Sequence, residues 1–394
     1  MKTSIAGITL KNPIIIASGP LTASLDLLKK AEDNGAAGAS LKLTFEKVPF
    51  PGKLRAHSLP GKGLLFGIDK RLNKDEGLEL MRRGKEETSL VLLANMTHPS
   101  SDLEKWKTLA REFEQAGADI IEANLTCPHI GLPAEIIGEK IREELRSGAC
   151  IGQIPELCRV IVRGLKEAVR IPVIPKPYSA HTRFLEAAKA IQEGGADGIS
   201  ISSSIPTCLP APDIYRRGKP NISLLDKVSV GIVTGNPLAK HSTFGKISQV
   251  RMNTQLPVIA SGGASGWSDI VEFIMWGATA VSICTYLMWY GFEAIPKMLK
   301  GLKRYLAEQE IKSWDEIRGL SLQYLTTADH LQVIPGAARV DAQLCNGCGI
   351  CLRPGHCTAI ILQGKKAVVD PEQCIGCSVC VNLCSKKAIQ MEAF

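Results

Sequence analysis

Apolar residues recur along the N-terminal three quarters of the chain as short unbroken runs, separated by longer segments with helical periodicity. Runs that are apolar throughout, rather than alternating, are typical of strands buried on both faces of a parallel sheet. The pattern predicts strands at PIIIA, GASLK, LVLLAN, IIEANL, VIPK, GISIS, PVIAS and AVSIC. It predicts helices over 24–34, 102–116, 154–169, 183–194, 243–254, 267–276 and 292–309.

A Gly-Ala pair that closes a helix and leads into a strand occurs four times in this region. The glycines are Gly35, Gly117, Gly195 and Gly277, spaced 82, 78 and 82 residues apart. Because a further strand lies between successive pairs, a strand–helix unit recurs roughly every forty residues, which predicts an α/β fold of the (βα)8 TIM-barrel type. An open doubly wound sheet is the alternative. No G-x-G-x-x-G motif follows an early strand, so we expect no nicotinamide-binding unit.

Cysteine is the part of the composition that changes this picture. The chain has 13 cysteines, and a dense group lies between Cys345 and Cys384. It forms the runs C-x2-C-x2-C-x5-C and C-x2-C-x2-C-x3-C, which is the spacing of a two-cluster ferredoxin whose fourth cysteines cross between clusters. The spacing predicts two [4Fe–4S] ligand sets: Cys345, Cys348, Cys351 and Cys384, and Cys374, Cys377, Cys380 and Cys357. Structural zinc is the alternative, although a third cysteine so close does not easily join one tetrahedron.

Two features of the cysteine runs depart from the usual ferredoxin spacing. Five residues precede Cys357 in the first run, and Ser385 stands where proline commonly follows the last cysteine. Neither change removes a ligand. The composition therefore predicts a barrel over 1–310, a helical connector over 311–340 and a C-terminal ferredoxin-like domain over 341–394.

Charge and targeting signals exclude several classes of protein. The net charge is +8 without a dense basic run, so we expect no nucleic acid partner. The start of the sequence has no apolar export core, which together with the many thiols predicts a reduced cytoplasmic location. The stretch Phe273–Phe292 has no charged residue, but its glycines and polar residues favour a buried strand, a turn and a helix start over a membrane span.

Candidate chemistry lies at the C-terminal ends of the predicted strands, where (βα)8 barrels carry their active sites. Cys127 follows the fourth strand, and a thiol can hold or release a proton near neutral pH. Lys176 ends the fifth strand, and a lysine within an apolar strand is costly unless it faces a ligand. Gly262 and Gly263 follow the seventh strand, where the backbone can approach a phosphate.

The segments NLTCPH, ACIGQIPEL and IPVIPK, with the turns after the seventh and eighth strands, resemble the dihydroorotate dehydrogenase superfamily. With the two-cluster tail, nearly the whole chain is similar to the FMN and iron–sulfur part of dihydropyrimidine dehydrogenase. The resemblance implies FMN in the barrel, Cys127 as general acid or base, and Lys176 near the flavin N1/O2 edge. It also implies flavin contacts at Ser18, Lys42, Asn95, Asn124, Gly235, Gly262, Gly263, Cys284 and Thr285, and substrate contacts at Asn124, Ser203 and Ser204.

Three positions depart from the pyrimidine enzymes. Ser203 and Ser204 stand where those enzymes have Asn-Thr, and FGI at 66–68 lacks an asparagine. Lys42 is offset by one position within its motif. Because amides that grip a pyrimidine ring discriminate strongly between substrates, these changes leave the substrate open.

The combined prediction is an FMN- and iron–sulfur-dependent oxidoreductase that reduces or forms an activated C=C bond of a small cyclic substrate. We expect a separate FAD/NAD(P)H reductase subunit or a ferredoxin as the electron partner, in a homo- or hetero-oligomer. The alternatives are a dihydroorotate dehydrogenase and an electron-transfer subunit without a substrate of its own. Cys150 competes with Cys127 as the acid, because it lies in a segment, 131–152, that could cover the site.

Overall fold

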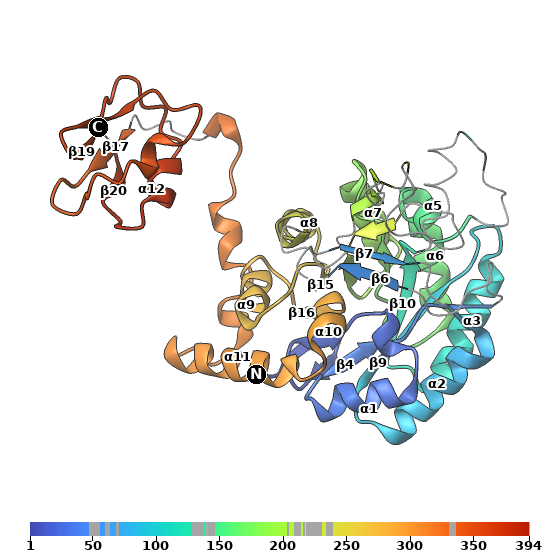
Figure 1. Cartoon of the computed structure of the whole chain (residues 1–394). Helices are drawn as coiled ribbons and strands as arrows, with labels where there is room; N and C mark the ends of the chain where they lie inside the picture. Colours follow the sequence, from blue (N-terminus) through green and yellow to red (C-terminus); the bar gives the residue numbers. More distant parts are fainter. Residues whose placement is uncertain are drawn as a thin grey trace. The chain divides into compact units, whose positions relative to one another are not determined.

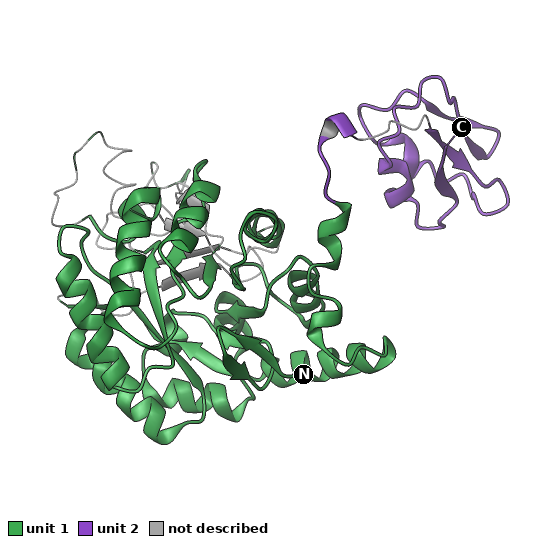
Figure 2. Ribbon diagram, turned by 180° about the vertical axis from the view of Figure 1, so that it is seen from behind, with its two compact units in different colours: residues 1–324 green, residues 325–394 purple. Residues whose placement is uncertain are grey.

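The computed structural model divides into two compact units, residues 1–324 and 325–394 (Figure 2). Residues of the expected connector, 311–340, lie in both. The structure describes residues 1–46, 56–59, 64–67, 71–127, 138, 140, 146–202, 205–208, 214–215, 217, 231–233, 239–330 and 336–393.

The main sheet of the first unit is a parallel barrel. Its strands follow one another in the order β11-β10-β9-β4-β3-β16-β15-β12, and a parallel bridge between Tyr178 and Ser202 joins the two ends of this series. The predicted (βα)8 barrel is therefore confirmed, and an open sheet is excluded. The strands are β3 (Ile14–Ile16), β4 (Gly38–Ser40), β9 (Val91–Thr97), β10 (Ile120–Leu125), β11 (Lys176–Pro177), β12 (Ile199–Ser202), β15 (Val258–Ser261) and β16 (Ala280–Ile283).

Helices cover the outside of the barrel, and α1, α2, α3 and α6 lie side by side along it (Figure 1). Each predicted helical segment is present. The helices are α1 (Leu25–Asp33), α2 (Lys74–Glu87), α3 (Leu103–Gln115), α6 (Pro155–Ala168), α7 (Phe184–Glu193), α8 (Ala239–Asn253), α9 (Trp267–Met275) and α11 (Ala294–Glu308). Shorter helices are α5 (Ala149–Gly152) and α10 (Thr285–Tyr290).

Helix α2 was not predicted from the sequence. Its N-terminus is set by a capping box, in which the Asn73 side chain accepts from the Glu76 N–H at 2.9 Å and the Glu76 carboxylate accepts from the Asn73 N–H at 3.0 Å. Gly77 and Gly84 are buried on its inner face, where a Cβ would collide with the side chains of the strands beneath. The buried face of α2 therefore combines two glycines with Leu80 and Met81, and most of its other positions are charged.

The floor of the barrel is apolar. A hairpin of β1 (Thr3–Ile5) and β2 (Ile8–Leu10) places Ile5 and Leu10 against Ile15 of β3 and Leu93 of β9. This cluster is separate from the larger core between the strands and the outer helices. The hairpin thus closes the N-terminal end, and the opposite end remains for a site.

Part of the expected connector packs on the barrel. Trp314, at the start of the 3₁₀ helix η3 (Trp314–Glu316), is buried and donates from Nε1 to the Met1 carbonyl oxygen at 3.0 Å. Arg318 Nη2 donates to Thr3 Oγ1 at 3.1 Å. Residues up to Tyr324, the end of η4 (Leu320–Tyr324), are thus part of the first unit.

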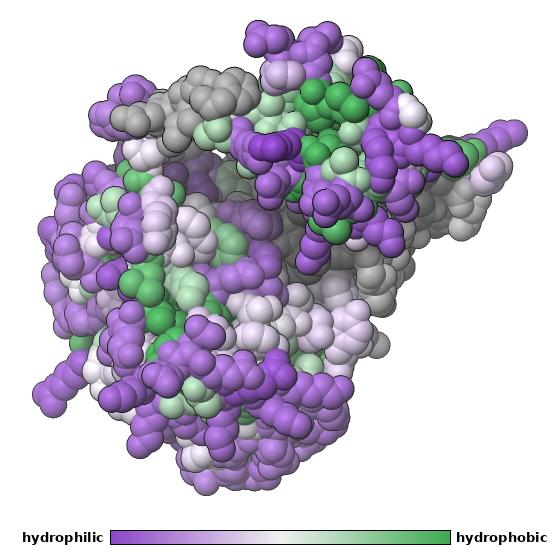
Figure 3. Space-filling model, turned by 90° about the vertical axis from the view of Figure 1, so that its left-hand side faces the viewer, coloured by the Kyte–Doolittle hydropathy of each residue, from purple (hydrophilic) through white to green (hydrophobic). Residues whose placement is uncertain are grey.

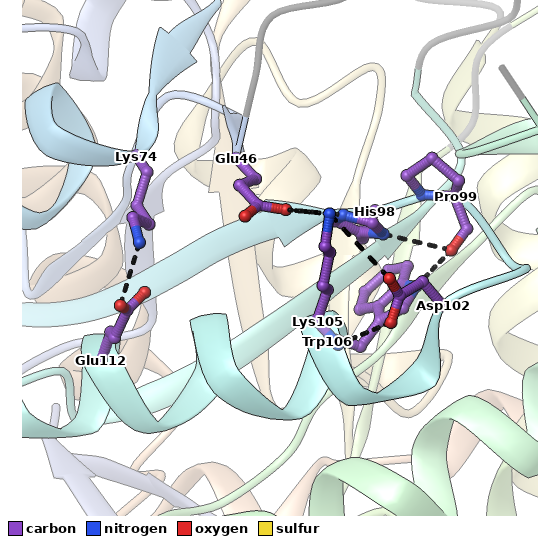
Figure 4. Close-up of polar contacts among 8 residues, drawn as sticks. All are labelled: Glu46, Lys74, His98, Pro99, Asp102, Lys105, Trp106 and Glu112. Atoms are coloured by element: carbon purple, nitrogen blue, oxygen red, sulfur yellow. Dashed lines mark hydrogen bonds and ion pairs between the residues drawn. The ribbon is translucent and has the colours of Figure 1, made fainter. Parts of the chain in front are cut away.

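Polar contacts fix the connection between β9 and α3 (Figure 4). Asp102 caps α3 by accepting from the Lys105 N–H at 3.1 Å, and Trp106 Nε1 donates to the Pro99 carbonyl at 3.2 Å. His98 Nε2 lies 3.0 Å from Glu46 Oε2. The last contact ties the end of β9 to the segment after β5 (Thr44–Phe45), which holds the chain that carries Lys42 against the chain that carries Asn95.

The uncharged stretch Phe273–Phe292 forms the end of α9, strand β16 and helix α10, as predicted. None of the helices in the described part of the chain has the length and apolarity that a bilayer span requires. Figure 3 shows polar and charged side chains over most of one face of the molecule, with apolar side chains in separate small patches.

The second unit contains two small antiparallel sheets around the cysteine runs. One sheet pairs β17 (Gly336–Val340) with β20 (Ile389–Ala393), and the other pairs β18 (Ile360–Gln363) with β19 (Lys366–Val369). The 3₁₀ helix η6 (Ile350–Leu352) and helix α12 (Val379–Leu383) each follow one of the C-x2-C loops. Cys351 and Cys380 are buried in its small core.

Candidate active site and cysteine cavities

Side chains that face the barrel interior change from apolar to polar along each strand. Residues two apart on a strand share one face. On β10 the series is Ile120, Glu122 and Asn124, and toward β11 it is Ile174 and Lys176, with the isoleucines in the apolar floor. The polar members therefore form a layer above the floor, at the C-terminal ends of the strands.

A chain of hydrogen bonds runs through this layer to Cys127. The buried Glu122 carboxylate accepts from Ser40 Oγ at 2.5 Å and from Asn95 Nδ2. Asn95 Oδ1 accepts from Asn124 Nδ2 at 2.9 Å, and Asn124 Oδ1 accepts from the Cys127 N–H at 2.8 Å. Because a carboxylate can only accept, it sets the orientation of both amides, and through them it fixes the backbone of Cys127.

Three basic side chains lie at this end of the barrel near Cys127. Arg71 Nη2 lies 3.1 Å from Cys127 Sγ, and Lys176 pairs in register with Asn124 on the neighbouring strand. Lys42 follows β4 and is buried. Burial is the main cause that holds the pKa of the Lys42 ammonium well below its usual range, and the positive charges of Arg71 and Lys176 act in the same direction. This end of the barrel therefore favours a ligand with negative charge.

The eighth strand brings Cys284 and Thr285 to the same end, next to the segment after β3. Cys284 Sγ is packed so closely on Gly19 that a Cβ at residue 19 would come within 2.6 Å of it. Burial raises the pKa of the Cys284 thiol, and the nearby lysines oppose this only in part. Thr285 begins α10, and Ser18 is half-buried beside Gly19.

The turn after β15 also lies at this end. Gly262 and Gly263 have φ angles of +111° and +96°, a region that favours glycine. A Cβ at Gly263 would come within 2.7 Å of Lys240 Cβ, so α8 can approach only because this residue is glycine. Thr243 Oγ1 of α8 donates to the Gly262 carbonyl at 3.1 Å.

The structure thus brings together ten of the sequence-predicted barrel residues at one end. They are Ser18, Lys42, Asn95, Asn124, Cys127, Lys176, Gly262, Gly263, Cys284 and Thr285. Gly235, Ser203 and Ser204 lie outside the described residues, and so does residue 68 of the FGI segment.

Sequence reasoning missed several residues of this site. Glu122 carries the same signal that drew attention to Lys176, an ionisable group within an apolar strand. Arg71 comes from the chain before β8 (Leu72–Asn73), and nothing near it in the sequence links it to Cys127. Thr97 Oγ1 is buried without a hydrogen-bond partner among the described residues, which is a position that a bound ligand can satisfy.

The other barrel cysteines differ from Cys127 in their surroundings. Cys150 is half-buried in α5, where its N–H donates to the Ser147 carbonyl oxygen at 3.2 Å. Cys158 is fully buried in α6, and burial raises the pKa of its thiol to about 12. A thiol with so high a pKa stays protonated and inert, so Cys158 is structural.

The two cysteine runs of the second unit fold in the same way. Gly347 and Gly376 have φ angles of +73° and +70° at matching positions between the first two cysteines. Gly349 and Ser378 have φ angles of +74° and +59° after the second cysteine. The sequence repeat is therefore also a repeat of backbone conformation, and Ser378 occupies a left-handed position that glycine fills in the first run.

Each run contributes three cysteines to one cavity and its fourth to the other. One cavity is lined by Cys345, Cys348, Cys351 and Cys384, and the other by Cys357, Cys374, Cys377 and Cys380. Among the described residues, no three Cys, His, Asp or Glu side chains converge closely enough to hold a single metal ion. Thiolates that surround a cavity rather than a point suit a polynuclear cluster better than a tetrahedral zinc ion.

Backbone N–H groups point at the sulfurs of both cavities. The Ala367 N–H lies 3.5 Å from Cys345 Sγ, and the Ala338 N–H lies 3.4 Å from Cys374 Sγ. The N–H groups of Ala367 and Gly347 lower the pKa of the Cys345 thiol. Such donors favour the thiolate form that binds iron.

Comparison with known families agrees with both units. The family described as dihydroorotate dehydrogenase matches residues 67–306, which is more than half of the chain. The chain belongs to the dihydroorotate dehydrogenase family. A 4Fe-4S binding domain matches residues 367–390, which include the second cysteine run. This dihydroorotate dehydrogenase family member is thus an oxidoreductase of CH–CH bonds, with a barrel of a flavin-dependent family and an iron–sulfur unit.

Curated relatives of this family member cover most of its length. It is 28% identical over 373 residues to the NAD-dependent dihydropyrimidine dehydrogenase subunit PreA of Escherichia coli, covering 89% of this chain and 84% of that protein. It is 29% identical over 335 residues to the dihydroorotate dehydrogenase B (NAD(+)) catalytic subunit of Pyrococcus abyssi, covering 82% and 99%. It is 27% identical over 344 residues to the chloroplastic dihydropyrimidine dehydrogenase (NADP(+)) of Arabidopsis thaliana, covering 83% and 78%.

Proposed function

We propose that this chain binds FMN at the open end of the barrel and reduces, or in the reverse direction forms, a C=C bond conjugated to a carbonyl in a small cyclic substrate. The substrate is of the kind that dihydropyrimidine dehydrogenases handle. The observation that carries this proposal is the position of Cys127 Sγ, held by the hydrogen-bond chain from Glu122 and placed 3.1 Å from Arg71 Nη2 at the polar end of the barrel.

The described residues fit a flavin at this end. Arg71 and Lys176 supply positive charge, which suits the negative charge of a reduced flavin and of a phosphate tail, and an anion bound here also favours the charged form of Lys42. The buried hydroxyl of Thr97 offers a polar contact. Lys176 and Lys42 are the residues that would hold the charged edge of the ring, and the Gly262–Gly263 turn is the part that would hold the phosphate.

Adding hydrogen across such a bond requires a hydride on one carbon and a proton on the other. FMN, when bound, supplies or accepts the hydride. Cys127 holds the proton at Sγ and passes it to the substrate carbon, and the neighbouring Arg71 guanidinium stabilises the thiolate that remains. The hydrogen bond from the Cys127 N–H to Asn124 keeps the sulfur in place during this transfer.

The two cysteine cavities of the second unit hold one [4Fe–4S] cluster each in this proposal. Cys345, Cys348, Cys351 and Cys384 bind the first, and Cys357, Cys374, Cys377 and Cys380 bind the second. The shared backbone conformation of the two loops supports a second cluster in the run that the 4Fe-4S family match does not include.

A pure electron-transfer subunit is less well supported by the site. A barrel that only relays electrons has no need of a thiol fixed at the end of a chain of buried side chains, and such buried polar chains are costly unless every member is satisfied. A dihydroorotate dehydrogenase is the second candidate, because the alignment spans 99% of the Pyrococcus abyssi catalytic subunit.

The proposed function is tested by a substrate screen under anaerobic conditions. The enzyme is photoreduced with deazaflavin and mixed with uracil, thymine, orotate or a cyclic enone, and flavin absorbance is followed. We expect at least one of these to reoxidise the flavin with saturation. Orotate alone as oxidant would support the second candidate, and failure of all four would contradict a site for conjugated C=C bonds.

The isolated chain should not oxidise NADH or NADPH at a useful rate. The sequence has no dinucleotide fingerprint, so a separate FAD/NAD(P)H reductase subunit or a ferredoxin must supply the electrons, in a hetero-oligomer or a transient complex. Steady-state assays of the purified chain with and without an added reductase measure this. Rapid, saturable NAD(P)H oxidation by the chain alone would contradict it.

Replacing Lys176 by alanine should weaken FMN retention or make the flavin harder to reduce. A cation beside the N1/O2 edge stabilises the reduced anion, so its loss lowers the reduction potential. Flavin content and spectroelectrochemical titration measure both effects. Lys166→Ala is a matched control, because Lys166 pairs with Asp197 on the outside of the barrel at 2.6 Å. If both variants had the same flavin content and the same flavin reduction potential, Lys176 would have no contact with the flavin.

A further inference from the structure

The lysines of the second unit lie around one of its two cysteine cavities. Lys366 Nζ donates to the Cys345 carbonyl oxygen at 2.5 Å, and Lys386 lines the cavity that contains Cys345. The Lys387 N–H donates to the Cys384 carbonyl at 3.0 Å. Lys365 belongs to the turn that packs its backbone on Gly347, inside the first cysteine loop. All four lysine side chains are exposed.

The rim of the second cavity has a different character. It includes His356, Gln373 and Ser378, and none of the described residues that line it is lysine or arginine. The acidic residues Asp370 and Glu372 lie in the segment that leads into the second cysteine run. The first run is likewise preceded by an acidic residue, Asp341, and Arg353 comes just before Pro354 of the second rim, but the four lysines of the second unit all lie on the side of the first cavity. Positive charge is therefore greater on that side.

Apolar side chains are exposed among these lysines. Leu344, next to Cys345, is 52% exposed. Leu362 lines the first cavity and is also exposed. Apolar groups within a ring of like charges are typical of a surface that docks a partner of opposite charge, because the charges steer the encounter and the apolar groups are buried on contact.

We propose that this surface, formed by Lys365, Lys366, Lys386, Lys387, Leu344 and Leu362 and called here the lysine face, binds an acidic electron-carrier protein. The proposal rests on the proposed function, because it assigns the cluster of the first cavity as the one that exchanges electrons with that protein. Each transfer oxidises the carrier by one electron and reduces the cluster by one. Two transfers and two protons balance the reduction of one C=C bond.

The test measures binding rather than turnover. The full-length holoprotein is passed over an immobilised acidic plant-type ferredoxin, and association rates are recorded over a range of salt concentrations. Two variants lose four lysines each, so that both have a net charge of +4 in place of +8. The lysine-face variant is K365Q/K366Q/K386Q/K387Q, and the matched control on the barrel unit is K297Q/K300Q/K303Q/K312Q.

We expect wild-type protein and the control to associate at similar rates that fall with salt, and the lysine-face variant to associate roughly 10- to 100-fold more slowly at low salt. Iron content and the visible spectrum of each variant establish that the second unit is intact. The proposal would be overturned if both variants lost association rate equally, or if the wild-type protein showed no salt-dependent binding.

The result of this binding test is independent of the result of the substrate screen. Photoreduction with deazaflavin bypasses the carrier, so a substrate that reoxidises the flavin supports the proposed function even where the carrier does not bind. Salt-dependent binding that the lysine-face variant loses supports the lysine face even where every substrate fails.

Discussion

Replacing Cys127 by serine should slow substrate turnover by roughly 10²-fold or more, the usual scale for loss of a general acid or base. Serine keeps the size of the side chain and the backbone hydrogen bond to Asn124, but its hydroxyl is a much weaker acid than a thiol. The effect should therefore fall on the chemical step. Single-turnover reoxidation of the photoreduced enzyme by substrate measures it, with flavin and iron content unchanged.

Cys150→Ser is the matched control for this variant. Cys150 is half-buried, as Cys127 is, and lies in α5, which packs against β10 and β11. We expect the Cys150→Ser variant to turn over substrate at nearly the wild-type rate. A loss confined to Cys150→Ser would assign the acid to the segment that could cover the site, and Cys127 would then be a packing residue.

Replacing Cys384 by alanine should remove about four of the eight irons that two [4Fe–4S] clusters hold. Cys384 belongs to the second run in the sequence but lines the cavity of Cys345, Cys348 and Cys351. The cluster that it loses should therefore be the one that the first run holds. Iron analysis and electron paramagnetic resonance of the dithionite-reduced protein measure this.

The pairing is decided by comparing spectra between variants. The signal that survives in Cys384→Ala should match that of Cys348→Ala and differ from that of Cys377→Ala. The opposite match would mean that each run keeps its own fourth cysteine. Stoichiometric zinc in the wild-type protein would contradict the cluster assignment altogether.

The strands of the barrel could be predicted because burial on both faces leaves an apolar run with no alternation. Helix α2 was not predicted, because two of its four buried positions are glycines, the other two are Leu80 and Met81, and its remaining positions are mostly charged. A helix that packs partly by close approach of its backbone has only a short apolar stripe in the sequence. Its capping box at Asn73 and Glu76 was the local signal available.

The residues of the candidate site also differ in whether a local sequence pattern predicts them. Cys127 and Lys176 could be found because each stands at the end of its own apolar strand, and strand ends meet at one end of a barrel. The contact of Arg71 with Cys127 depends on the pairing of β5 with β8 and with β9, which no local pattern encodes. Glu122 was visible as a carboxylate within an apolar strand, but its role appears only when its hydrogen bonds are traced.

The closure of the barrel has a consequence for how the protein responds to its ligands. Strand β11 has two residues, and a single bridge from Tyr178 to Ser202 joins its side of the wall to β12. Hydrogen bonds from the Asp197 N–H to the Val173 carbonyl at 3.0 Å and from the Ser200 N–H to the Pro175 carbonyl at 2.8 Å also cross this seam. Lys176 lies at this seam, so a molecule bound both to Lys176 and to the neighbouring strands adds contacts across it that the unfolded chain does not have. Occupancy of the site and resistance to heat and proteolysis are thereby linked, each rising with the other.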